Sequence, residues 1–124
     1  MSRYQLSRSA GAEWRFALFD SEKVIGVINF DQIVKGPFQA CYLGYSIDSE
    51  YQGKGLMREA LSQTISFVVR ELDLNRVMAN YEPSNQRSAR LLKSLGFERE
   101  GYARKYLKLN GIWRDHILTS LISD

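Results

Sequence analysis

The stretch GYSIDSEYQGKGLMREAL, residues 44–61, decides how the rest of the chain is arranged. An alternating apolar run ends at Ile47, a short polar loop follows, and Gly53 and Gly55 precede a segment with helical apolar spacing. This pattern predicts a strand, a tight glycine turn and the start of a helix. The exposed N–H groups of such a turn lie at the positive end of the helix dipole, which suits a phosphate or pyrophosphate. A turn that only joins a strand to a helix is the alternative reading.

Apolar spacing on either side of this stretch predicts the remaining elements. Strands are expected at 14–19, 24–30, 40–47, 76–81, 97–109 and 112–122, and helices at 56–72 and 86–95. The Asn110-Gly111 pair predicts a tight hairpin between the last two strands. Residues 1–13 are polar and carry no clear period, so they are expected to form a poorly ordered arm.

The expected order β-β-β-α-β-α-β-β gives one domain over residues 1–124. The strand–helix–strand connections in the middle favour parallel pairing, and the hairpins at both ends favour antiparallel pairing. The residues therefore predict a mixed α/β domain. One candidate ligand site lies at the C-terminal end of the strand 40–47, where the glycine turn begins.

Charge and composition restrict the function classes. The net charge of +3 and the pI near 9.1 suit an anionic ligand but are too small to argue for nucleic acid. Cys41 is the only cysteine, which excludes an internal disulfide or a cysteine-based metal cluster. No run approaches the ~20 apolar residues of a membrane span, and the first residues lack the apolar segment of a signal peptide. A cytoplasmic enzyme or binding protein is expected, with no membrane partner.

A second motif, NQRSARLLKSLGF at residues 85–97, follows QGKGLM, residues 52–57, by about thirty residues. In this order the two resemble the GNAT superfamily of acyl-CoA-dependent N-acetyltransferases. The strings LGYSIDSEYQGKGLM, RVMANYEPSNQRSARLLKSLGFEREGY and NGIWRDHILTSL resemble its RimJ/RimL-type ribosomal-protein alanine N-acetyltransferases, the RimJ side in particular. The resemblance covers roughly residues 14–122. It implies a mostly antiparallel sheet with splayed central strands, flanking helices and a shortened N-terminal part, with the family's N-terminal helical segment absent.

The resemblance also implies acetyl-CoA as cosubstrate and no metal. It places the pyrophosphate on the glycine turn and the pantetheine arm along the splayed strands, with a backbone N–H near Ser46 or Ile47 as oxyanion hole. The implied cofactor-binding residues are Tyr45, Ser46, Ile47, Gln52, Gly53, Lys54, Gly55, Leu56, Met57, Asn80 and Asn85. The family usually has glycine or alanine at the position of Met57, so this methionine fits only if it points into the core. Arg58 could add charge to the phosphates.

Two catalytic residues follow from the same resemblance. Asn85 and Ser88 match the family's Asn-x-x-Ser, and Asn85 also suits a helix N-cap. Leu92 stands where many family members carry a tyrosine that protonates the leaving thiolate. The RimL-like branch is thought to use a serine for that step, which here is Ser88.

The general base is left open by the sequence. A peptide α-amine has a pKa of about 8, so it is already partly neutral and needs only a weak base. The available groups are Glu82, Glu100, Asp115 and His116, and alternation sends Asp115 and His116 to opposite faces of the last strand. Tyr102 and Tyr106 could line an acceptor cleft, although aromatic residues in a strand are usually packing.

The expected function is transfer of an acetyl group from acetyl-CoA to an amine. The resemblance implies a protein N-terminus beginning with alanine or serine as acceptor, such as that of a ribosomal protein, for a monomer or homodimer without direct nucleic-acid contact. The alternative is a non-catalytic CoA-binding or dimerisation domain, left by loss of the N-terminal acceptor-binding segment. A nucleotide-binding P-loop does not match the glycine spacing, and nothing brings Cys41 to His116 for thiol chemistry.

Overall fold

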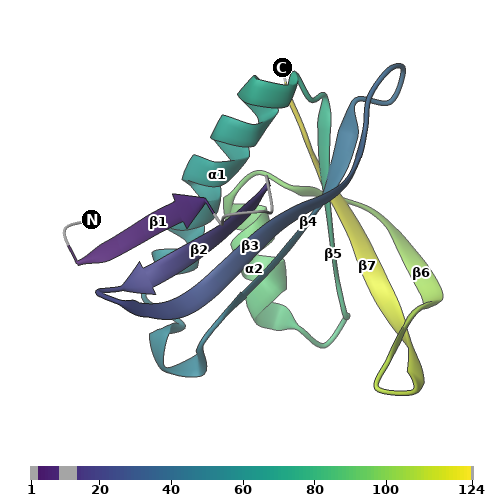
Figure 1. Cartoon of the computed structure of the whole chain (residues 1–124). Coiled ribbons are helices and arrows are strands. Elements are labelled where there is room, and N and C mark those ends of the chain that lie inside the picture. Colours follow the sequence, from purple (N-terminus) through teal and green to yellow (C-terminus); the bar gives the residue numbers. More distant parts are fainter. Residues whose placement is uncertain (1–2, 9–13, 124) are drawn as a thin grey trace.

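The structure is a computed structural model that describes residues 3–8 and 14–123. Within these residues the chain forms seven strands, two α-helices and one short 3₁₀ turn (Figure 1). The strands are β1 (Tyr4–Arg8), β2 (Arg15–Asp20), β3 (Lys23–Val34), β4 (Ala40–Ile47), β5 (Arg76–Tyr81), β6 (Glu98–Leu109) and β7 (Ile112–Ile122). The helices are α1 (Leu56–Leu72) and α2 (Gln86–Ser94), and the 3₁₀ turn η1 covers Ser49–Tyr51.

The strands form one sheet in the order β1-β2-β3-β4-β5-β7-β6. Neighbouring strands are antiparallel except β4 and β5, which are parallel and joined through α1. α2 connects β5 to β6, but these two strands do not pair, because β7 lies between them and β6 is at the edge of the sheet. The predicted mixed α/β fold with a mostly antiparallel sheet is confirmed.

The two central strands separate after a short pairing. β4 and β5 pair only from Ala40 opposite Arg76 to Tyr42 opposite Met78. Figure 1 shows them diverging beyond this point, with α2 visible between them. On its other side β4 stays paired with β3 as far as Ile47. The main-chain groups of β4 that face β5 therefore lose their strand partner, which is the expected splay.

The expectation of a poorly ordered N-terminal arm is wrong for Tyr4–Arg8, which form β1. This strand pairs with β2 from Tyr4 opposite Asp20 to Arg8 opposite Phe16. Tyr4 and Leu6 pack against the core, so their alternation was the signal for a strand. An edge strand needs only one partly apolar face, which is why its polar composition was misleading. Residues 1–2 and 9–13 of the expected arm lie outside the described residues.

β3 is longer than the apolar pattern of its residues predicts. The strand expected at 24–30 continues to Val34, because pairing with β4 resumes at Val34 opposite Ala40 after a register shift that follows Asp31. Gln32 has φ 50° at this shift, as in a bulge. A two-residue period cannot reveal a bulge, since the extra residues interrupt the alternation.

The β6–β7 hairpin extends away from the helices (Figure 1). Its turn residues Asn110 and Gly111 have φ of 52° and 79°, as a type I′ turn requires. The predicted hairpin is confirmed. Ile112 and Trp113, just after the turn, are more than half exposed.

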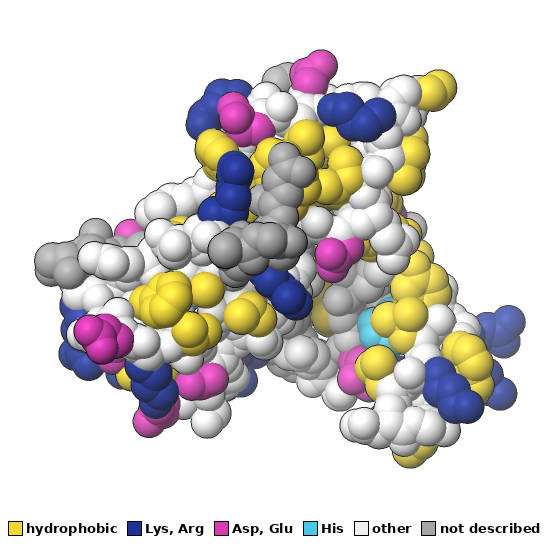
Figure 2. Space-filling view, in the orientation of Figure 1, with side chains coloured by type: hydrophobic (Ala, Val, Ile, Leu, Met, Phe, Trp, Pro, Cys, Tyr) yellow, Lys and Arg dark blue, Asp and Glu magenta, His cyan; other side chains and the backbone are white. Residues whose placement is uncertain are grey.

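The core lies between one face of the sheet and the two helices, which are both behind the sheet in Figure 1. Ala60, Leu61 and Val68 from α1 are fully buried there, and so is Leu92 from α2. The predicted apolar stripe of α1 is confirmed. Within the described residues, the opposite face carries no helix, and Figure 2 shows apolar side chains at its surface.

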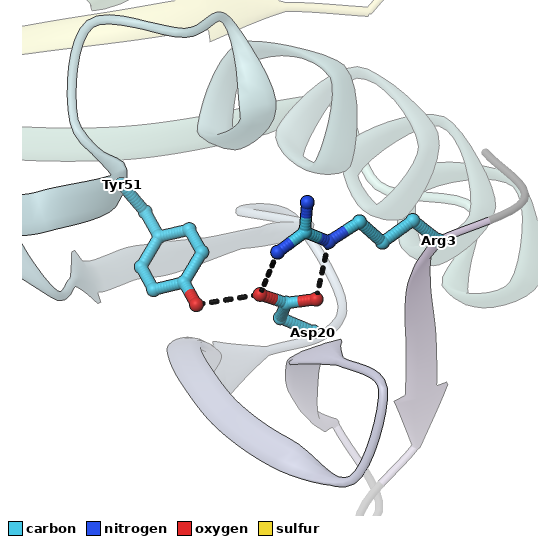
Figure 3. A network of polar contacts seen from close by, with 3 residues as sticks. All are labelled: Arg3, Asp20 and Tyr51. Carbon is cyan, nitrogen blue, oxygen red and sulfur yellow. Dashed lines mark hydrogen bonds and ion pairs between the residues drawn. The ribbon is translucent and has the colours of Figure 1, made fainter.

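A three-residue network ties β1 and η1 to the buried end of β2 (Figure 3). The Asp20 carboxylate accepts hydrogen bonds from the guanidinium of Arg3 at 2.7 and 2.9 Å and from the Tyr51 hydroxyl at 2.5 Å. Arg3 and Tyr51 hold the pKa of Asp20 at about 2, below its ordinary value of 3.8. A carboxylate on the buried face of a strand needs such partners, since an unpaired charge there would destabilise the fold.

This network predicts a specific acid sensitivity. Because the pKa of Asp20 is lower in the folded state, the network stabilises the protein above about pH 4 and loses this effect as the pH falls toward about 2. Asp20→Asn should therefore flatten the decrease of the unfolding free energy in that window, as measured by urea unfolding at a series of pH values. Arg3→Gln should act in the same direction, because Arg3 is the main cause of the shift. Parallel profiles for wild type and both variants would contradict the assignment.

Candidate functional site

A cleft of about 630 Å³ opens where β4 separates from β5. Its wall combines the end of β4, the turn that leads into α1, and one side of α2. The lining residues are Tyr45, Ser46, Ile47, Tyr51, Gln52, Gly53, Gly55, Leu56, Met57, Arg58, Asn85, Arg87, Ser88, Arg90, Leu91 and Ser94. The two sequence motifs, separated by about thirty residues, thus meet in one cavity.

The glycine turn has the conformation that its sequence predicts. Gly53 and Gly55 have φ of 78° and 76°, in the left-handed region that favours glycine. A Cβ at either position would meet no described atom within 4 Å, so the space beside the turn is open. Gly55 is the N-cap of α1, and no side chain of the described residues caps it. The first N–H groups of α1 are therefore left for a ligand, and their partial positive charge favours an anion.

The main chain of Ile47 faces the space between the splayed strands. Asp48 donates its N–H to the Ile25 carbonyl of β3 at 2.8 Å, and partners alternate along an antiparallel strand. The N–H and C=O of Ile47 must then point away from β3. The Gln52 side chain confirms this direction, because its amide donates to the Ile47 carbonyl at 3.3 Å. Of the two predicted oxyanion positions, Ser46 and Ile47, this alternation favours Ile47.

The start of α2 fixes the position of Ser88. The Asn85 side chain accepts a hydrogen bond from the Ser88 N–H at 3.1 Å, so Asn85 is an N-cap as its sequence position suggests. The Ser88 Oγ in turn accepts a hydrogen bond from the Tyr45 hydroxyl of β4 at 3.1 Å. Burial raises the pKa of Tyr45, so this hydroxyl stays protonated at neutral pH. This contact between β4 and α2 was not predicted.

Three arginines give the cleft a positive wall. Arg58 lies in the first turn of α1, and Arg87 and Arg90 are three residues apart on α2. The Arg58 guanidinium donates to the Ser94 hydroxyl across the two helices at 3.1 Å. Sequence reasoning named Arg58 but missed Arg87 and Arg90. Their signal was the spacing 87, 90, 91, 94, which lies on one face of a helix.

Three predicted site residues, Met57, Lys54 and Asn80, have side chains that lie in the core or outside the cleft lining. Met57 is 6% exposed and lies in the core, as its departure from the family pattern required. Lys54 is not among the lining residues; its ammonium lies 5.4 Å from the ring centre of Tyr51. Asn80 also lies outside the lining, next to Tyr106, whose pKa is raised mainly by its hydrogen bond with Tyr42 and only partly offset by Asn80. The cleft therefore brings together the predicted residues other than Lys54 and Asn80.

Asp115 holds a bulge in β6. The pairing of β6 with β7 shifts between Ala103 and Leu107, and Lys105 in this segment has φ 46°. The Asp115 carboxylate accepts hydrogen bonds from the Lys105 N–H at 2.9 Å and from the Tyr102 hydroxyl at 2.6 Å. These donors lower the pKa of Asp115. The Asp115 carboxylate therefore stabilises the bulge, and its hydrogen bond with the Tyr102 hydroxyl also holds the Tyr102 side chain in place.

The other candidate bases also have partners outside the cleft. The Glu82 carboxylate lies 3.7 Å from Arg114, and that of Glu100 lies 2.5 Å from Arg76. His116 is 5% exposed, with Nδ1 3.1 Å from the Arg114 carbonyl and its ring centre 5.7 Å from that of Tyr106. None of these four candidates lines the cleft, so the structure assigns no base.

Potential metal ligands do not cluster in the described residues, and the cysteine is buried. Within residues 3–8 and 14–123, no three His, Cys, Asp or Glu side chains lie together as metal ligands. Cys41 is fully buried, and burial raises the pKa of its thiol to about 11, which disfavours a reactive thiolate.

Within residues 3–8 and 14–123, neither helix is long and apolar enough to span a bilayer.

Known proteins share this sequence and fold. Residues 1–98 match the family model of the acetyltransferase (GNAT) domain. The chain is 54% identical over 113 residues to the ribosomal protein uS5-alanine N-acetyltransferase of Escherichia coli K12, covering 90% of this chain and 58% of that protein. The ribosomal-protein-S5-alanine acetyltransferase of Vibrio fischeri superposes with a TM-score of 0.86 at 49% identity, covering 89% and 61%. RimJ of Mycobacterium smegmatis, solved in complex with CoA-disulfide, gives 0.83 at 27% identity, covering 88% and 52%.

The matched family model includes every segment that lines the cleft, from β4 through the glycine turn to α2. The chain spans between 52% and 61% of the length of these three relatives. The resemblance carried by QGKGLM and NQRSARLLKSLGF is confirmed by the extent of these matches. The chain belongs to the GNAT acetyltransferase family.

Proposed function

We propose that this protein transfers an acetyl group from acetyl-CoA to the N-terminal α-amine of a protein. The observation that carries the proposal is the cleft, in which an uncapped helix N-terminus, two left-handed glycines and three arginines surround one open space. That combination fits a pyrophosphate. The M. smegmatis relative was solved with a CoA-disulfide, which supports the same ligand class here.

The residues that would hold acetyl-CoA form two groups. The main chain from Gln52 to Met57 would bind the pyrophosphate, with Arg58, Arg87 and Arg90 balancing its charge. The edge of β4 that faces the splay would bind the pantetheine arm as an added strand does. Acetyl-CoA supplies the acetyl group as an activated thioester.

The remaining steps belong to this chain's own groups. The Ile47 N–H faces the splay and would stabilise the negative charge that develops on the acyl oxygen. Ser88 would protonate the leaving sulfur, since it lines the cleft, Asn85 holds its main-chain N–H and Tyr45 orients its hydroxyl. An α-amine acceptor reaches its neutral form without a strong base, which agrees with the absence of the four candidate bases from the cleft wall.

The acceptor is proposed from the relatives. The E. coli and V. fischeri proteins carry ribosomal-protein alanine acetyltransferase names, so we infer an alanine-initiated ribosomal protein N-terminus and a cytoplasmic reaction. The test is mass spectrometry of three peptides incubated with protein and acetyl-CoA. An Ala-initiated peptide should gain one acetyl group, whereas its Nα-blocked copy and an Nα-blocked lysine peptide should not. Acetylation of the lysine peptide alone would contradict the acceptor.

The arginine wall gives a prediction of its own. Arg87→Ala combined with Arg90→Ala should weaken acetyl-CoA binding about 10-fold and reduce its dependence on salt, because two cations near the phosphates are lost. Calorimetric titration at two salt concentrations measures both effects. Lys93→Ala is the matched control, since Lys93 belongs to α2 but does not line the cleft. Equal affinity of the double variant and the control would remove the arginines from the site.

A non-catalytic CoA-binding domain is the alternative function. The specific observation in its favour is the open sheet face within the described residues, opposite α1 and α2 (Figure 2). Under that alternative, acetyl-CoA binds the cleft and no peptide is acetylated. The peptide experiment above separates the two functions directly.

A further inference from the structure

We propose that Tyr45 supplies the proton that Ser88 delivers, so that the two hydroxyls act as one relay. The inference rests on the proposed function and adds to it a second residue, Tyr45, which acts through Ser88. Its basis is the 3.1 Å hydrogen bond from the Tyr45 hydroxyl to the Ser88 Oγ, which joins β4 to α2 inside the cleft.

The geometry leaves the Ser88 proton free to point into the cleft. The Ser88 Oγ accepts from Tyr45, and the Ser88 N–H donates to the Asn85 side chain at 3.1 Å. Serine carries one hydroxyl proton, and neither contact uses it. Ser88 is therefore held at its main-chain N–H by Asn85 and at its Oγ by Tyr45, while its hydroxyl proton remains available.

Acidity explains why serine needs this partner. A thiol has a pKa of about 8.5 and a tyrosine one of about 10, so a phenol can protonate a leaving sulfur at modest cost. A serine acting alone would be left as an alkoxide, a far stronger base than a phenolate. Tyr45 is protonated at neutral pH and so holds a proton to donate, although burial raises its pKa and adds to the cost of the transfer.

The proton transfers balance as follows. The Ser88 O–H bond breaks as the proton bonds to the leaving sulfur, and the Tyr45 O–H bond breaks as its proton restores the Ser88 hydroxyl. The acceptor amine loses one proton when its new amide forms. That proton reaches the Tyr45 phenolate through solvent in the cleft and restores the starting state.

Kinetics of Tyr45→Phe, Ser88→Ala and the double variant test the relay. Tyr45→Phe should lower kcat about 10-fold with KM for acetyl-CoA nearly unchanged, because only the hydroxyl is removed. The double variant should be no slower than Ser88→Ala alone, since Tyr45 acts through Ser88. Tyr4→Phe is the control: Tyr4 lies on the edge strand β1, outside the cleft lining.

A second readout needs neither turnover nor acetyl-CoA. Burial raises the pKa of Tyr45, and Ser88 offsets part of that rise because its hydroxyl can turn to donate to the phenolate. Ser88→Ala should therefore raise the Tyr45 pKa, which NMR titration of its labelled ring carbon detects. An unchanged pKa would overturn the contact on which the relay depends.

The outcomes separate this inference from the proposed function. Absence of peptide acetylation by the wild type would overturn the proposed function and the relay together. Normal wild-type acetylation with an unchanged kcat in Tyr45→Phe would overturn the relay alone. Multiplying effects in the double variant would mean that Tyr45 acts independently of Ser88, which also overturns it.

Discussion

Gly55→Asp should reduce acetyl-CoA affinity by at least about 100-fold, because it puts a carboxylate where the pyrophosphate is held. The open space beside Gly55 would receive the new side chain, so the backbone need not move to accommodate it. Aspartate also tolerates the left-handed conformation better than most residues, so the fold should survive. Calorimetric titration measures the affinity, and circular dichroism checks the fold.

Gly55→Asn is the matched control for this variant. Asparagine has nearly the same shape and the same tolerance of positive φ, but no charge. It should lose much less affinity than the aspartate variant. Equal losses for both would assign the effect to steric blocking, and unchanged binding in Gly55→Asp would remove the phosphate assignment.

Ser88→Ala should lower kcat about 100-fold with little change in KM for acetyl-CoA, which is the usual scale for loss of a general acid. The Asn85 cap survives in this variant because it uses the Ser88 N–H, not the hydroxyl. The loss can then be assigned to the proton donor rather than to the helix. Steady-state kinetics with an Ala-initiated peptide measure it.

Ser66→Ala controls for the loss of a serine hydroxyl on a helix. Ser66 is exposed on α1 and lines a different groove. It should keep the wild-type rate. A rate of Ser88→Ala equal to that of this control would end the role of Ser88 as acid.

Local patterns were sufficient for much of the fold. The predicted bounds of β4, α1, β5 and β7 agree with the structure. α1 and β5 bury one regular face, whereas β4 and β7 also bury adjacent residues, such as Ala40 and Cys41. β1 was missed because an edge strand carries little apolar surface. The extension of β3 was missed because a bulge near Gln32 interrupts the alternation.

Some features of the site could be predicted from the sequence, and others could not. The glycine turn and the Asn85 cap depend on a few neighbouring residues, so their geometry could be predicted from short motifs. The Tyr45–Ser88 hydrogen bond joins residues 43 positions apart, and only the packing of α2 against the splayed strands brings them together. The bulge held by Asp115 likewise depends on the pairing of two strands. Such tertiary contacts leave no local period in the sequence.

The most direct test of the central claim is an amide NMR titration of the isotope-labelled protein with acetyl-CoA. If the cleft holds the pyrophosphate at the N-terminus of α1, the largest shift changes will fall on Gly53, Gly55 and Leu56, with further changes at Ile47. The β6–β7 hairpin should change little. Absence of changes in the glycine turn, or changes confined to the hairpin, would contradict the account.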